Sequence, residues 1–136
     1  MTLRLEIVTP DARAFSDDVD MVVLPGIEGE MGIYPNHVPL MTQLKPGELR
    51  LLKGGKETAL AVGEGFVEIS QTKVSVLTDL AIEESAIDEQ AVQKAIERAQ
   101  AALAEKQHMN DEEIATVEAT ISKSMAQLHV KRRKGA

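Results

Sequence analysis

An α+β fold, in which a strand-rich domain precedes an antiparallel α-helical hairpin, is predicted by a change in composition near residue 84. All five prolines lie at or before Pro46, and eight of the nine glycines lie at or before Gly65. Residues 1–84 carry 14 acidic and seven basic side chains, whereas residues 85–136 carry eight of each. We therefore predict two domains, at residues 1–84 and 85–136.

Alternating side chains predict the first strands. Apolar and charged residues alternate in Leu3–Ile7, which is the pattern of a half-buried strand. Val19–Leu24 is a second strand candidate, and Pro25-Gly26 is expected to stop it.

Two hairpins are predicted further along the chain. Gly54-Gly55 separates Leu49–Lys53 from Lys56–Val62, and a Gly-Gly pair adopts the positive φ angles of a tight turn without penalty. Gly65–Ile69 and Lys73–Leu77 flank three polar residues and form the second hairpin. Short strands with a turn about every ten residues are typical of an all-β sandwich or barrel, and they leave no room for βαβ crossovers.

The second part carries two apolar stripes at helical spacing. The stripes comprise Val92, Ile96, Ala99 and Leu103 in the first helix and Ile114, Val117, Ile121, Met125 and Leu128 in the second. Asp88 and Asn110 are predicted N-caps, and Glu113 follows Asn110 as in a capping box. A short connection, Gln107 to Asp111, implies an antiparallel hairpin.

An alanine face on the first helix predicts close but weak packing. The face comprises Ala91, Ala95, Ala99 and Ala102. Small side chains let helices approach but bury little apolar area, and burial contributes about 25 cal/mol per Å². We expect the helix pair to be marginal by itself, to dock on something and to be able to undock.

Composition excludes several classes of function. The chain has no cysteine, which removes disulfides, thiolate nucleophiles and cysteine-ligated zinc. Its net charge of −7 argues against general nucleic-acid binding, since phosphate neutralisation needs a basic face. No apolar run approaches the roughly 20 residues of a membrane-spanning helix, and the first residues lack the features of a signal peptide. We expect a cytoplasm-facing protein whose only membrane attachment is through a partner.

No catalytic or metal-binding constellation is recognisable in the sequence. Gly63-x-Gly65 lacks the third glycine and the following helix of a dinucleotide motif and is interpreted as a turn between strands. The three histidines, His37, His108 and His129, do not have metal-ligand spacing. We therefore predict neither an enzyme nor a metal site.

Three polar features have two interpretations each. His37 is either a structural hydrogen-bonding residue in a turn-rich segment or a partner contact. Glu28 and Glu30, which stand among glycines, are either a solvated hairpin tip or carboxylates presented to a partner. The basic residues 131–134 are either a frayed terminus or an electrostatic contact with acidic protein, anionic lipid or nucleic acid.

The chain closely resembles the epsilon-subunit family of F-type ATP synthases in a series of ordered motifs. The motifs are Gly29-Glu30-x-Gly32-Ile33-Tyr34-Pro35-x-His37-x-Pro39-Leu40, Leu44-Lys45-Pro46-Gly47-x-Leu49-Arg50, Leu5-x-Ile7-Val8-Thr9-Pro10, Gly63-x-Gly65-Phe66-Val67-Glu68-Ile69, Val74-x-Val76-Leu77-x-Asp79-x-Ala81 and Ile87-Asp88. With the helical pair, they cover essentially the whole chain. Asn36 and Val38 replace a glycine and an alanine that are frequent in bacterial relatives, and asparagine can adopt positive φ, so the turn should survive.

The resemblance implies a β-sandwich of about ten strands followed by the helical hairpin, in a non-catalytic rotor subunit. Family members bind the gamma subunit in the central stalk, rest on the ring of c subunits and couple proton flow to ATP synthesis. In the family, the loop matching Glu28, Glu30 and Met31 meets the c ring, and the segment matching His37 lies near the gamma contact. The implied location is peripheral, on the cytoplasmic face of the bacterial inner membrane, with membrane contact only through the c ring.

The resemblance also implies a regulatory role for the helices. In bacterial relatives the pair either folds onto the sandwich or extends along gamma into the alpha and beta subunits of the catalytic head, where it opposes ATP hydrolysis. Such a switch needs two docked states within a few kcal/mol, which suits the weak predicted packing. Lys123 and the cations from Lys131 to Lys134, including Arg132 and Arg133, are candidates to face acidic segments of the head.

Some family members bind ATP in the folded helix pair through a pattern Ile/Leu-Asp-x-x-Arg-Ala. This chain keeps Asp88, and Arg98 stands at the position of a second family arginine, but Ala91 replaces the first. A triphosphate thereby loses its main charged donor, so we predict weak or absent ATP binding and no cofactor. The alternative from another class is a free-standing β-sandwich binding module whose helical hairpin mediates dimerisation.

Overall fold

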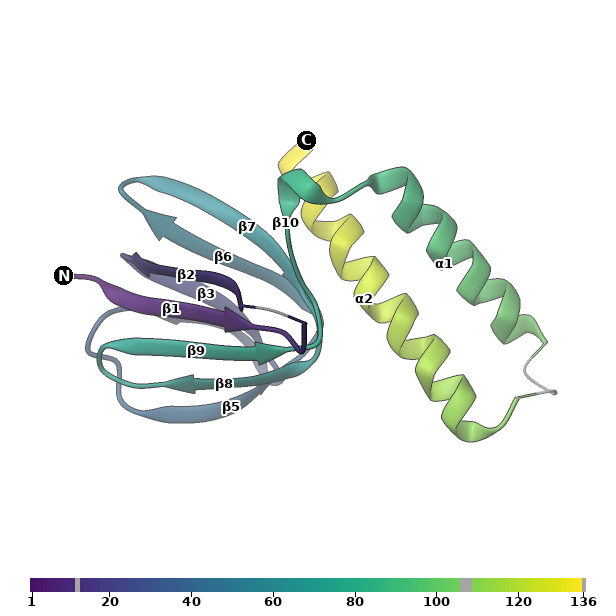
Figure 1. Cartoon of the computed structure of the whole chain (residues 1–136), viewed down its shortest axis with the longest axis horizontal. Coiled ribbons are helices and arrows are strands. Elements are labelled where there is room, and N and C mark those ends of the chain that lie inside the picture. Colours follow the sequence, from purple (N-terminus) through teal and green to yellow (C-terminus); the bar gives the residue numbers. More distant parts are fainter. Residues whose placement is uncertain (12, 106–108, 136) are drawn as a thin grey trace.

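The computed structural model describes residues 1–11, 13–105 and 109–135. Its strands are β1 (Leu3–Val8), β2 (Arg13–Val19), β3 (Met21–Gly26), β4 (Gly29–Ile33), β5 (Leu40–Leu44), β6 (Gly47–Lys53), β7 (Lys56–Val62), β8 (Gly65–Ile69), β9 (Lys73–Thr78) and β10 (Ala81–Glu83). A 3-10 turn, η1 (Glu84–Ala86), leads to the helices α1 (Glu89–Ala104) and α2 (Asp111–Gly135). The predicted order of a strand-rich part followed by a helical pair is confirmed (Figure 1).

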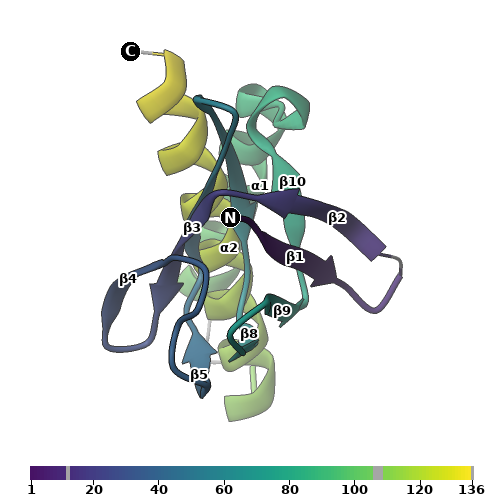
Figure 2. The ribbon, with the colours of Figure 1, turned by 90° about the vertical axis from the view of Figure 1, so that its left-hand side faces the viewer.

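The strands form one continuous sheet that folds over on itself. Their order is β10-β7-β6-β3-β5-β8-β9-β1-β2, with β4 paired to β3. β1 and β9 are parallel neighbours, whereas the hairpin pairs are antiparallel. A single residue pair, Gly26 with Leu44, joins β3 to β5, so the two halves of the sheet face each other as the layers of a sandwich (Figure 2).

Aliphatic side chains fill the space between the layers. The core residues are Leu3, Leu5, Ile7, Val19, Val22, Leu24, Ile33, Leu44, Leu49, Leu51, Leu60, Val62, Val67, Ile69, Val74 and Val76. Successive side chains of a strand point to opposite faces. Because Leu49 and Leu51 of β6 point into this core, Glu48 and Arg50 lie on the outer face of the same strand.

Strand β7 is covered on both faces. Leu60 and Val62 belong to the core between the layers, whereas Ala59 and Ala61 lie on the outer face, in a second cluster with residues of the helices. A strand buried on both sides is typically a continuous apolar run, as residues 59–62 are. The two alanines are small enough for α2 to approach the sheet closely.

The predicted strand Val19–Leu24 is wrong in its bounds. Val19 ends β2, and β3 runs from Met21 through Pro25 and Gly26 instead of stopping before them. Pro25 has no N–H to donate, and it is tolerated because the pairing of β3 with β6 extends only from Met21 to Val23.

Four strands lie outside the segments predicted as strands. β2 is rich in charge, β10 has only three residues, and β4 and β5 belong to the turn-rich run that begins at Gly29. β4 forms because Gly29 to Ile33 pair with Gly26 to Val22 of β3, which is a tertiary contact and not a local propensity. The interpretation of Glu28 as part of a hairpin tip is confirmed, since the turn joins β3 to β4.

Both predicted hairpins are present. Gly54 and Gly55 adopt φ angles of 58° and 81°, which few other residues take without strain, and Lys53 pairs with Lys56 around them. The turn at residues 70–72 joins β8 to β9, with Ile69 paired to Val74. Gly63 lies between β7 and β8, as the turn interpretation of Gly63-x-Gly65 requires.

The helix caps are confirmed, but the alanine face is only partly in the helix interface. Asp88 accepts a hydrogen bond from the Ala91 N–H at 3.1 Å, and Asn110 accepts one from the Glu113 N–H at 2.8 Å. Ala99 is buried, whereas Ala91 and Ala102 are exposed, because the interface follows the stripe of Val92 and Ile96. The predicted connection includes Gln107 and His108, which lie outside the described residues.

Candidate protein-interaction surfaces

An apolar row crosses the outer face of the layer that contains β8, β9 and β1. Phe66 in β8 pairs directly with Leu77 in β9, which in turn lies beside Val8 in β1. Phe66 and Leu77 are 52% and 53% exposed, whereas their inward-facing neighbours Val67 and Val76 are fully buried. Protein interfaces are enriched in aromatic residues, so the Phe66–Leu77–Val8 row is a candidate partner contact.

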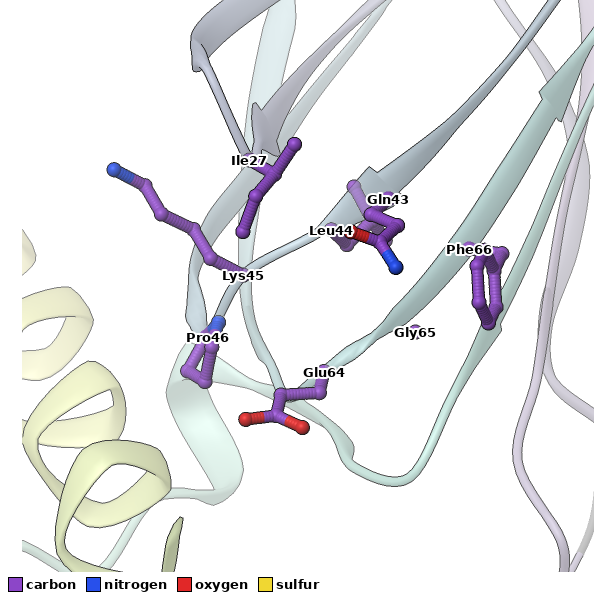
Figure 3. Close-up of a pocket in the computed structure, with 8 residues that line it drawn as sticks. All are labelled: Ile27, Gln43, Leu44, Lys45, Pro46, Glu64, Gly65 and Phe66. Carbon is purple, nitrogen blue, oxygen red and sulfur yellow. The ribbon is translucent and has the colours of Figure 1, made fainter. Parts of the chain in front are cut away.

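A hollow of about 390 Å³ lies at one end of this row. Its lining residues are Ile27, Gln43, Leu44, Lys45, Pro46, Glu64, Gly65 and Phe66. Figure 3 shows Phe66 on its strand at one side and Ile27 at the other, with Lys45 and Glu64 carrying the charges. A mostly apolar hollow with one ammonium and one carboxylate at its edge suits a side chain of another protein.

The loop between β4 and β5 extends the apolar surface. Val38 is 74% exposed and Met41, at the start of β5, is 67% exposed. Asn36 has a φ of 68°, as expected for an asparagine at a position where glycine is frequent in bacterial relatives. The His37 Nδ1 lies 2.6 Å from the Val38 carbonyl oxygen, which supports the structural interpretation of His37. A partner contact by the rest of its ring stays a prediction.

The three candidates in the β3–β4 hairpin have different environments. Glu28 lies exposed in the turn and makes no ion pair within the described part of the chain. Glu30 accepts a hydrogen bond from Arg50 at 3.0 Å. Met31 is half-buried and packs against the core of the sandwich. Of the three, Glu28 is the side chain most available to a partner.

The helix pair is attached to the sandwich through α2, which lies between the sheet and α1 (Figure 1). The apolar part of this junction comprises Ala59, Ala61, Ile82, Ile87, Val92, Ile96, Leu128 and Val130. Two of these residues are alanines, and the cluster is smaller than the core between the layers. The junction therefore gains less from apolar burial than the sandwich does.

Four cations of α2 are paired within the chain. The pairs are Lys123 with Asp79 at 2.7 Å, Lys131 with Glu84 at 3.3 Å, Arg132 with Glu89 at 2.8 Å and Arg133 with Glu48 at 2.7 Å. Three pairs join α2 to the sandwich or to η1, and the pair of Arg132 joins α2 to α1. The candidate residues Lys123, Arg132 and Arg133 are thus all occupied while the helices are docked. The Lys134 side chain lies outside the described part of the structure.

The pair of Arg133 differs from the others because its carboxylate is buried. The Glu48 side chain is only 5% exposed, and it also accepts a hydrogen bond from Arg50 at 3.2 Å. Burial opposes the charge of Arg50, but hydrogen bonds to Glu48 and Glu30 outweigh that cost and raise the pKa of its guanidinium. Arg50 therefore stays charged beside Glu48 at neutral pH.

Sequence reasoning missed this buried cluster. The alternation of Glu48-Leu49-Arg50-Leu51 does place two charged residues on one face of a strand. Their third member, Arg133, lies 85 residues away from Glu48 in the chain, and no local pattern connects them. The same alternation rule could have predicted that Phe66 and Leu77 point away from the core, since Val67 and Val76 beside them are buried.

The three polar positions of the family's ATP site, Asp88, Ala91 and Arg98, are exposed, whereas Ile87 of the same pattern is buried in the helix junction. The Asp88 carboxylate is occupied as the helix cap. Ala91 is exposed and carries no donor beyond its backbone, and Arg98 is exposed without an ion pair to any described residue. Within the described residues, no group of three or more His, Cys, Asp or Glu side chains is arranged to hold a metal ion.

Neither α1 nor α2, as far as the structure describes them, is long and apolar enough to cross a lipid bilayer.

A sandwich with exposed apolar contacts and a docked helical hairpin is the architecture of a protein-binding subunit. Residues 2–84 match the family model described as ATP synthase, Delta/Epsilon chain, beta-sandwich domain. The chain is 44% identical over 134 residues to the ATP synthase epsilon chain of Dehalococcoides mccartyi, covering 97% of this chain and 95% of that one. It is 41% identical over 130 residues to the epsilon chain of Chloroflexus aggregans, covering 96% and 92%.

The fold also resembles a solved structure. A chain of the Euglena gracilis mitochondrial ATP synthase, in an assembly of OSCP, F1 and c-ring, aligns with a TM-score of 0.76 at 24% identity, covering 92% of this chain and 78% of that one. The family model over residues 2–84 and the 44% identity to the Dehalococcoides mccartyi chain show that the chain belongs to the epsilon-chain family of ATP synthases, whose members are non-catalytic subunits of that complex. Because the chain belongs to this family, the alternative interpretation as a free-standing binding module is rejected.

Proposed function

We propose that the chain is a central-stalk rotor subunit that couples proton translocation to ATP synthesis and opposes ATP hydrolysis through its C-terminal helices. The observation that carries the regulatory part is the junction of α2 with the sandwich. It combines a small apolar cluster with ion pairs, so it can open without unfolding the sandwich. A Tetrahymena thermophila chain of similar fold, with a TM-score of 0.60, 12% identity and coverage of 96% and 97%, comes from a central stalk and c-ring assembly.

The gamma subunit is the proposed partner of the Phe66–Leu77–Val8 row and of the loop that holds His37. The row and the loop are neighbours in the sheet, because β5 follows the loop and pairs with β8. Together they present exposed apolar side chains on a rigid layer, which favours a stable protein contact over a transient one.

The c ring is the proposed partner of the β3–β4 hairpin. Glu28 presents an exposed carboxylate at the tip, and Glu30 and Met31 follow it in β4. Contact with the polar loops of the ring would place the subunit at the cytoplasmic face of the bacterial inner membrane without inserting it. The bacterial origin of the relatives from Dehalococcoides mccartyi and Chloroflexus aggregans supports this location.

The acidic segments of the alpha and beta subunits are the proposed partners of α2 in an extended state. Lys123, Arg132 and Arg133 are the cations for this contact, and each would first have to leave its present carboxylate. For the more exposed pairs of Lys123 and Arg132, exchange of one carboxylate for another changes the free energy little, which helps to keep the two states close in energy.

Removing all residues after Ser85 is expected to leave gamma binding within about threefold of the full chain, because the proposed interface, the Phe66–Leu77–Val8 row and the loop that holds His37, lies entirely in the sandwich. The same truncation should relieve inhibition of ATP hydrolysis in the assembled complex. Pull-down with purified gamma and ATPase assays of the reconstituted complex measure the two effects. Loss of gamma binding would show that the interface lies on the helices instead.

Isothermal titration of the isolated chain with ATP is expected to show no micromolar binding. Asp88 is engaged as a cap and Ala91 provides no charged donor, so a triphosphate has too few partners. An Ala91→Arg variant, which restores the family pattern at an exposed position, should bind more tightly than the original chain. Micromolar affinity of the unmodified chain would contradict the prediction.

A further inference from the structure

We propose that Glu48 makes docking of the helix pair conditional on Arg133. In this view Glu48 is a carboxylate of the sandwich that α2 can cover only while Arg133 neutralises it. The inference rests on the proposed regulatory role of the helices and adds the residue pair that controls it.

The burial of Glu48 comes from α2. Glu48 lies on the outer face of β6, since its neighbour Leu49 points into the core. It lines a hollow at the junction together with Ser122, Ala126 and His129 of α2. When α2 leaves, the outer face of β6 opens to water, so docking itself transfers this carboxylate out of solvent.

The sandwich by itself does not neutralise Glu48. Arg50 contacts Glu48 at 3.2 Å but also Glu30 at 3.0 Å and Glu57 at 3.4 Å, so its charge is not devoted to Glu48 alone. Lys45 and His129 line the same hollow, but neither forms an ion pair with Glu48 in the described structure. Arg133 supplies the second cation and occupies the carboxylate oxygen that Arg50 does not contact.

The other ion pairs of α2 do not impose this condition. In the pairs of Lys123 and Lys131, both partners are between 27% and 41% exposed. The pair of Arg132 is more exposed still, at 59% and 46%. Water can replace the lost partner in these pairs, whereas loss of Arg133 leaves a covered carboxylate whose remaining cation, Arg50, is shared with Glu30.

Binding of Arg133 by a partner subunit would therefore also favour release of α2 from the sandwich. A carboxylate of a partner that takes Arg133 removes the charge that lets α2 cover Glu48. The docked state then becomes unfavourable even though the apolar junction is unchanged. Arg133 thus acts as the positioning residue for the docked state.

Thiol labelling of an Ala126→Cys variant tests the inference in the isolated full chain. The chain has no other cysteine, and Ala126 is 6% exposed in the same hollow, so the labelling rate reports how often α2 leaves the sheet. Adding Arg133→Gln is expected to raise the rate about 10- to 100-fold. The matched control Arg132→Gln should change it less than about threefold.

A double variant decides between loss of a favourable pair and exposure of a covered charge. Glu48→Gln together with Arg133→Gln should label more slowly than Arg133→Gln alone, because a neutral amide is easier to cover. Equal rates for the Arg133→Gln and Arg132→Gln variants, or a double variant as fast as Arg133→Gln, would overturn the proposal. Hydrogen exchange of the β8 amides distinguishes undocking from unfolding, because these amides stay protected when only the helices leave the sandwich. The isolated chain contains no partner subunit, so failure of this inference is distinguishable from failure of the proposed function.

Discussion

Replacing Gly65 with alanine is expected to destabilise the sandwich by about 3 kcal/mol. A Cβ atom at this position would lie 1.8 Å from the carbonyl oxygen of Leu77 and 2.8 Å from the Thr78 Cα. Both are backbone atoms of β9, so no rotamer change relieves the clash, and β8 would have to separate from β9. Since domains of this size are stable by about 5 to 15 kcal/mol, the loss is a large fraction of the total.

Urea unfolding followed by circular dichroism measures this effect, with Gly32→Ala as the matched control. Gly32 also lies in a strand, but a Cβ there would meet nothing closer than the Met21 side chain at 3.7 Å, and its φ is not positive. We expect the control to change stability by less than about 0.5 kcal/mol. A Gly65→Ala variant as stable as the control would show that β8 and β9 are not held as closely as described.

Replacing Phe66 with aspartate is expected to weaken gamma binding at least about 100-fold while leaving the fold intact. Aromatic residues at the centre of an interface often account for 2 kcal/mol or more of binding, and a carboxylate would also have to be desolvated there. Because Phe66 is half exposed in the isolated chain, its removal costs the sandwich little. Leu77→Asp, at the directly paired position, should have a similar effect.

Surface plasmon resonance with immobilised gamma measures the loss, and unfolding curves show that the variants are folded. Met125→Asp is the control, since Met125 is 53% exposed but belongs to α2 and not to the Phe66–Leu77–Val8 row. Its affinity for gamma should stay within about threefold of the original chain. If Met125→Asp weakens binding as much as Phe66→Asp does, the sandwich row is not the gamma contact.

Local patterns predicted those elements whose stability is local. The Gly54-Gly55 turn, the caps at Asp88 and Asn110 and the apolar stripes of the helices each depend on residues a few positions apart. The strands with clear alternation, such as β1 and β6, were predictable for the same reason. The motif series around His37 added the family, which the comparisons confirm.

Strands that depend on distant partners were not predictable. β4 contains two glycines and becomes a strand because β3 lies beside it, and β2 is rich in charge but pairs along its length with β1. The missing N–H of Pro25 predicts a stop, but β3 continues through this residue because its pairing with β6 has already ended at Val23. The proposed domain boundary after residue 84 falls within η1 and stays a prediction.

The candidate site residues divide in the same way. Glu28 at a hairpin tip and Asp88 at a helix start follow from turn and cap chemistry. The ion pairs of Glu30 with Arg50 and of Lys123 with Asp79 depend on how the sheet folds and on where α2 packs against it. These contacts define the docked state, which the chain must give up before the same cations meet a partner.

The sequence by itself determined the class of fold, the two-part organisation of composition and charge, and the family. These features are carried by spacing along the chain, which sets turns, caps and amphipathic faces. Only the tertiary structure decided that α2 covers β6 and β7, and that Glu48 is buried between Arg50 and Arg133. The reason is that the burial of a carboxylate depends on what packs over it, and the residue that neutralises it here comes from the far end of the chain.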